Sequence, residues 1–203
     1  MMRFHYGAVP EDIGFNPEPG VWSELRQPGP LVLNFMAIPV VLLLMLAMSG
    51  LLYLFLPRGV SVLTSQAWIS LPMLFAILPL HEIIHGLFFP GNGLDRKTVL
   101  GIWPSRLICY ASYEGEITRE RSLLAALGPF LVLSLFPLIL IFIARLFEPD
   151  PRWLTGLSTF SLISGVIASG DMFLFVLVLT RIPKGAMIRS QGWRTFWKPA
   201  ELA

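Results

Sequence analysis

The residues of this chain best suited to chemistry are His81-Glu82-Ile83-Ile84-His85, an H-E-x-x-H sequence. Residues four apart lie on one face of a helix, about one turn from each other, so both imidazoles can reach one metal ion. In zinc hydrolases with this motif the two histidines bind the metal and the glutamate acts on its water. The chain has only three histidines, and two of them are in the motif. The motif therefore predicts that His81 and His85 bind Zn²⁺ and that Glu82 is catalytic.

The segments that must position this motif are apolar. The chain of 203 residues is 55% hydrophobic and 14% charged, with a mean hydropathy of +0.69. Each of four apolar segments is long enough to cross a bilayer as a helix, and they lie at about residues 31–56, 67–90, 122–147 and 157–180. The motif is in the second segment. We expect an all-α membrane protein whose single domain, residues 31–180, contains about four transmembrane helices.

Three segments outside these helices are more polar. Residues 1–30 are rich in glycine and proline and predict an irregular arm. Residues 98–103 and 107–113 have strand-like compositions around a Pro-Ser turn, so we expect a small β-hairpin at the membrane surface. Residues 181–203 form a basic, aromatic tail, which we expect to anchor on anionic lipid.

Basic residues are unevenly divided between the two sides that four membrane spans define. Arg58, Arg145 and Arg152 fall on one side, and the other twelve of the fifteen Lys and Arg residues fall on the other. Cytoplasmic segments of membrane proteins carry an excess of Lys and Arg. This bias predicts that both termini and the hairpin are cytoplasmic.

Asp171 is the best candidate for a third zinc ligand, because a catalytic zinc usually has three protein ligands and one water. His81 lies nine residues before position 90, and Asp171 lies nine residues before position 180. At the helical rise, both are about 14 Å from the cytoplasmic end of a span, so their depths match. Ionisable residues inside a membrane are costly and usually functional. The alternative is that Asp171 is a helix-packing or ion-pairing residue without metal.

Other ligands and partners are limited by the composition. Cys109, Glu114 and Glu116 are second choices as ligands, since they reach the metal only if their loop dips inward. A single cysteine excludes an intrachain disulfide. No basic block with interleaved aromatic residues indicates a nucleic-acid groove. The expected partners are the lipid bilayer and a membrane-protein or peptide substrate, and the oligomeric state stays undetermined.

The motif and Asp171 together resemble the site-2 protease family of intramembrane zinc metalloproteases, which has H-E-x-x-H on one membrane helix and an aspartate ligand on a later one. The chain is more similar still to a bacterial family of small membrane proteins described as zincin peptidases. The matching pieces are residues 81–85, the stretch 109–120 leading to Leu127-Gly128-Pro129, and Ser169-Gly170-Asp171. The chain departs from site-2 proteases in lacking an Asn-Pro pair before Asp171.

The resemblance implies a protease of the bacterial plasma membrane. We expect a zinc metalloendopeptidase that cleaves a membrane-associated protein near the cytoplasmic face. In this hypothesis Glu82 takes a proton from the attacking water and passes it to the leaving amine. Two alternatives stay open. One is a non-catalytic protein that uses the metal as a structural element or sensor. The other, less favoured because four spans show no repeat, is a metal transporter.

Overall fold

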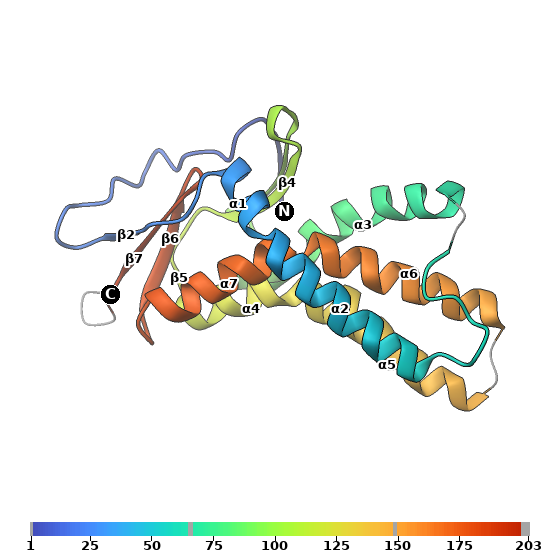
Figure 1. The fold of residues 1–203 in the computed structure, drawn as a ribbon. Helices are drawn as coiled ribbons and strands as arrows, with labels where there is room; N and C mark the ends of the chain where they lie inside the picture. The colour runs from blue at the N-terminus through green and yellow to red at the C-terminus, as the bar shows by residue number, and fades with distance from the viewer. Residues whose placement is uncertain (1, 65–66, 148–149, 200–203) are drawn as a thin grey trace.

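The computed structural model describes residues 2–64, 67–147 and 150–199. Within this part of the chain the helices form an elongated body, and two small β-sheets cover one end of it (Figure 1). Helices α4 and α7 lie beside the sheets, whereas α2, α5 and α6 extend away from them. Both chain termini lie at the end that carries the sheets.

The expectation of an all-α membrane protein is wrong. The described residues form a mixed α and β structure with seven strands in two sheets. The sequence indicated only two of these strands. The others are two to five residues long, and most belong to the N-terminal arm and the C-terminal tail. Strands this short carry too few alternations of apolar and polar residues to be recognised from their pattern.

The helices coincide with the four apolar segments for most of their length. Their bounds are α1 Pro30–Met36, α2 Ile38–Phe55, α3 Ala67–Phe88, α4 Arg119–Pro129, α5 Phe136–Ala144, α6 Pro151–Ile167 and α7 Ser169–Arg181. A π-helical stretch, Phe130–Leu135, joins α4 to α5. Short 3₁₀ turns occur at Pro90–Gly93, Pro104–Arg106 and Arg145–Phe147.

Three helical stretches in the described residues are long and apolar enough to cross a membrane: Pro30–Phe55, Trp68–Phe88 and Arg119–Phe147. The fourth predicted segment is not one helix. It is broken at Ala168 into α6 and α7, which meet at 48° and count as a fourth span only if taken together.

The first sheet contains the predicted hairpin. Strands β3 (Thr98–Trp103) and β4 (Ile108–Tyr113) pair antiparallel, from Thr98 opposite Tyr113 to Trp103 opposite Ile108. Strand β1 (Arg3–Tyr6), from the N-terminal arm, pairs parallel to β3 on its other side. The order β1-β3-β4 leaves β4 at an edge of the sheet.

The second sheet joins the arm to the tail. It has the order β2-β7-β6-β5, formed by Ser23–Leu25, Arg194–Lys198, Met187–Gln191 and Ile117–Thr118. Basic side chains of the tail pair with acids elsewhere. Arg189 contacts Asp12 at 2.7 Å and Lys198 contacts Glu116 at 3.0 Å. The tail expected to anchor on lipid therefore uses these charges to hold the sheet against its neighbours.

Helices α3 and α4 approach each other closely at Gly128. A Cβ added at this glycine would lie 2.4 Å from the Phe88 ring, which is closer than any normal contact. Phe88 itself packs against the two apolar clusters that fill the space between α3 and its neighbours. The close contact between α4 and Phe88 is therefore possible only because residue 128 is a glycine.

We predict that Gly128→Ala destabilises the protein, because the added methyl group must push Phe88 or α4 aside. Overpacking of this kind costs about 1–3 kcal/mol. Gly156, in α6, is the matched control because nothing lies within 4 Å of its added Cβ. Gly156→Ala should be neutral or stabilising by up to about 1 kcal/mol, the helix-propensity gain. Thermal unfolding of the purified variants measures both. Equal stability of the two variants would contradict the close approach.

Candidate metal centre

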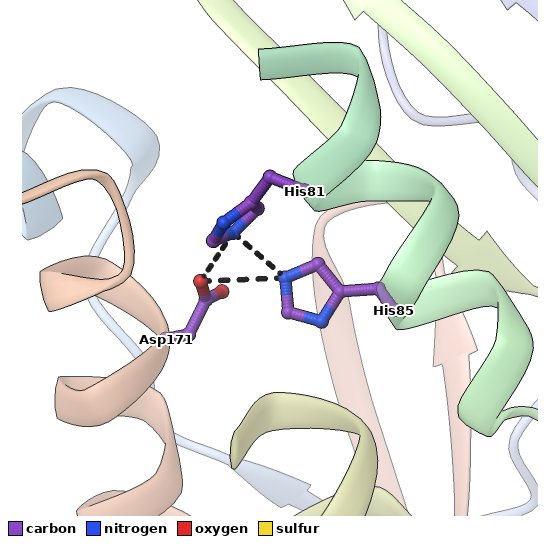
Figure 2. A group of neighbouring side chains, drawn as sticks. All are labelled: His81, His85 and Asp171. Carbon is purple, nitrogen blue, oxygen red and sulfur yellow. Dashed lines mark hydrogen bonds and ion pairs between the residues drawn. The ribbon is translucent and has the colours of Figure 1, made fainter. Parts of the chain in front are cut away.

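Three side chains from two helices converge on one point (Figure 2). His81 and His85 project from one face of α3, and Asp171 comes from the first turn of α7. His81 Nε2 lies 2.8 Å from Asp171 Oδ2 and 3.1 Å from His85 Nε2. His85 Nε2 lies 3.3 Å from the same carboxylate oxygen. The structure therefore brings together the three residues that the sequence predicted as ligands.

The spacing of these three atoms fits a zinc ion. Nitrogen and oxygen ligands at 2.0–2.1 Å in a tetrahedron lie about 3.3 Å from one another. The three measured separations, 2.8 to 3.3 Å, are close to that value. The histidine rings are buried, and the ligand atoms all lie within 4.8 Å of one another. A dication at their centre would satisfy two imidazole lone pairs and a carboxylate at once.

The hydrogen bond on the far side of His85 supports this fit. Its Nδ1 lies 2.8 Å from the backbone carbonyl oxygen of Ala125 in α4. A carbonyl can only accept, so Nδ1 carries a proton, and when the ring is neutral its lone pair is at Nε2. Metal-ligating histidines are typically held by such an outer hydrogen bond. For His81, both partners of the ring lie on its Nε2 side, and its buried Nδ1 has no partner in the described residues.

The break between α6 and α7 places Asp171 in a favourable position. Helix α7 begins at Ser169, so the carboxylate lies in its first turn. The partial positive charge at a helix N-terminus stabilises an anion there. The interpretation of residues 157–180 as one continuous span did not predict this helix start, although an acidic residue is common in the first turn of a helix.

Two arginines at the start of α4 hold the ends of both ligand-bearing helices. Arg121 donates from Nε to the Phe88 carbonyl at 2.9 Å and from Nη2 to the Phe89 carbonyl at 2.8 Å, at the end of α3. Arg119 is buried and donates to the carbonyls of Leu179 and Ile182 at 2.8 to 3.0 Å, at the end of α7. Helix α4 thereby fixes α3 and α7 relative to each other. From the sequence, these two arginines contributed only to the excess of basic residues that predicts the cytoplasmic side.

Glu82 lines the same cavity as the three ligands. This cavity has a volume of about 360 Å³, and its walls include β4 and the β6–β7 hairpin. Ala111, in β4, lines the same cavity wall region as Glu82. A carboxylate beside the ligands and facing a cavity is suitably placed for proton transfer to a water or substrate there.

The second-choice ligands do not join the cluster. Glu114 pairs with Arg3, and Glu116 pairs with Lys198. Cys109 lines the cavity, but it is outside the group that can hold a metal. Burial, and then the Glu82 carboxylate, raise the pKa of the Cys109 thiol, which keeps it in the protonated form that binds metal poorly.

We predict that Arg121→Ala weakens zinc binding without removing a ligand. Releasing the end of α3 moves His85 relative to Ala125, and loss of a ligand's outer hydrogen bond typically lowers metal affinity by about 10- to 100-fold. Arg106→Ala is the control, because this exposed side chain only stacks over Trp103, 5.7 Å from its ring centre. Competition with a fluorescent zinc chelator measures both affinities. An unchanged zinc affinity in Arg121→Ala would contradict the role of α4 in positioning.

The model of a family described as "putative zincin peptidase" matches residues 74–187, more than half of the chain. The matched range contains the three clustered ligands and Glu82. No curated protein and no solved structure matches the chain.

Proposed function

Because this chain belongs to the family of putative zincin peptidases, we propose that it is a membrane-embedded zinc metallopeptidase of the H-E-x-x-H type. Its substrate is a peptide bond of a membrane-associated protein near the cytoplasmic face. The observation that carries this proposal is the convergence of His81, His85 and Asp171 at the wall of a cavity that Glu82 also lines.

The residues of the site have separate roles in this mechanism. His81, His85 and Asp171 hold the zinc, which when bound supplies a Lewis acid and lowers the pKa of water at the site to about 7. Glu82 accepts the proton of the attacking water and gives it to the leaving amine. Ala125 keeps the His85 ring in the tautomer that can bind.

The exposed surface of the helices supports the membrane location. In the most apolar window of each candidate span, only 18% of Pro30–Phe55, 33% of Trp68–Phe88 and 28% of Arg119–Phe147 is buried within the protein. Large apolar side chains therefore face outward along α2, α3 and α5, among them Leu42, Leu43, Leu46, Leu54, Trp68, Phe75, Phe136 and Phe142. Exposed apolar side chains in this number support the proposal that these helices contact lipid.

The charge distribution supports a cytoplasmic location for the sheets and both termini. Twelve of the fifteen basic residues lie before residue 30, between residues 96 and 121, or from residue 181 onward. With this orientation β4 and the β6–β7 hairpin, which line the cavity, lie on its cytoplasmic side. The arrangement of two histidines on one apolar helix and an aspartate on a later one also supports a mechanism of the site-2 protease type.

The edge of β4 offers a place for an extended substrate. Its residues from Ile108 to Tyr113 line the cavity, and no strand pairs with this edge in the described residues. An extended peptide can add to such an edge through main-chain hydrogen bonds, which hold it without reading its sequence. A substrate bound there would pass beside Glu82.

The test of the function is Glu82→Gln. The wild-type protein, purified with zinc and reconstituted in vesicles with a panel of membrane-anchored reporter peptides, should cleave at least one, detected by mass spectrometry. Glu82→Gln should retain zinc and lose cleavage by about 10²- to 10⁴-fold, the contribution of a general base. Glu18→Gln, an exposed carboxylate of the arm, is the control and should cleave normally. Equal cleavage by wild type and Glu82→Gln would reject the mechanism. Zinc binding without any cleavage would favour a structural or sensory metal.

A further inference from the structure

The cavity at the metal centre has walls of two origins. The residues placed in the chemistry lie between positions 74 and 187, the range that the family shares. Five other lining residues lie outside that range: Leu33, Ile188, Ser190, Trp193 and Thr195. Four of these belong to the β6–β7 hairpin, and Leu33 belongs to α1. The family model thus accounts for the metal centre but not for this wall of its cavity.

The hairpin turn presents Trp193 to the cavity. Ser190 pairs with Thr195 and Gln191 pairs with Arg194, so the turn consists of Gly192 and Trp193. Gly192 has a φ of +58°, a conformation that glycine adopts without strain. The added Cβ of Gly192 would lie 3.2 Å from the Glu11 side chain, which places the turn against the N-terminal arm.

Hydrogen bonds hold the indole N–H and the backbone carbonyl of Trp193. Its indole N–H donates to the Pro28 carbonyl at 3.1 Å, and its own carbonyl accepts from the Gln27 side chain. Gln27 and Pro28 directly precede α1, which carries Leu33 on the same wall. With its N–H satisfied, the half-buried indole has only apolar surface to offer the cavity. A wall fixed in this way is preorganised to accept or reject a side chain by shape.

The chemistry of the lining limits what can bind. Among the described residues, the cavity is lined by the acids Glu82 and Asp171 but by no Lys or Arg. An acidic substrate side chain would therefore meet no cation other than the metal. Leu33, Ile188 and Trp193 instead form an apolar surface, with Ser190 and Thr195 as small neighbours.

We propose that Trp193 is a specificity-determining residue, and that the hairpin wall selects substrates with an uncharged apolar side chain of limited size beside the scissile bond. This inference rests on the proposed peptidase function. In this proposal, segments outside residues 74–187 determine which substrate is accepted, and the metal centre within that range performs the reaction.

The experiment measures binding and does not depend on turnover. The zinc-loaded full chain is titrated with capped peptide hydroxamates that differ only in one side chain: glycine, leucine, glutamate or naphthylalanine. The wild type should bind the leucine probe about tenfold tighter than the glycine probe, the usual discrimination of an apolar pocket, and should bind the other two weakly. Trp193→Ala should bind the naphthylalanine probe about tenfold tighter than the wild type does, with unchanged affinity for the glycine probe. Trp153→Ala, on an exposed tryptophan that does not line the cavity, should retain the wild-type ranking.

Two further variants guard against a purely structural effect. Trp193→Phe lacks the bond to Pro28 but keeps most of the bulk, so it should keep the preference for leucine. Ser190→Leu narrows the cavity at the same wall, so it should lower the affinity for the leucine probe and leave the affinity for the glycine probe unchanged. This variant keeps the test available if Trp193→Ala fails to fold. An identical ranking of probes in all variants, with the glycine probe bound normally, would overturn this inference and leave the peptidase proposal standing. Failure of every probe to bind the zinc-loaded wild type would overturn both.

Discussion

The whole site depends on the fixed contact of α4 with α3 and α7. The three candidate ligands come from two helices, and Asp171 follows His81 by ninety positions in the sequence. Helix α4 lies between them. Arg121 binds the end of α3, Arg119 binds the end of α7, and the Ala125 carbonyl holds the His85 ring. Gly128 lets this helix come close enough to Phe88 for those bonds to form.

This arrangement also explains why the two sheets lie at one end of the molecule. The ends of α3 and α7 that α4 binds are the ends from which the chain leaves for β3 and β6. Strands β4, β6 and β7, which follow these ends in the chain, form part of the wall of the cavity at the metal centre. Ion pairs such as Arg189 with Asp12 join the tail to the N-terminal arm, so segments from both ends of the chain complete one cavity.

Much of the site was predictable from the sequence, because it depends on regular geometry. The four-residue spacing of His81 and His85 and the helical rise that matched the depth of Asp171 need only an α-helix. The β3–β4 hairpin was predictable from composition and a turn. The rest of the sheets was not, because β1 pairs with β3, β2 with β7 and β5 with β6 over long separations in the sequence. Such pairings are chosen by tertiary contacts. The break at Ala168 has no proline to mark it, and Asp171, in the first turn after it, was interpreted as a residue within one continuous span.

The central claim is that His81, His85 and Asp171 hold one zinc ion. Its most direct test is the metal content of the purified protein, measured by elemental analysis for the wild type, His81→Ala, Asp171→Ala and His5→Ala, which changes the third histidine of the chain. The account predicts one zinc per chain in the wild type and in His5→Ala, and loss of zinc in the other two variants. A wild-type protein that binds no stoichiometric zinc, or an Asp171→Ala variant that binds it as tightly as the wild type, would contradict the account.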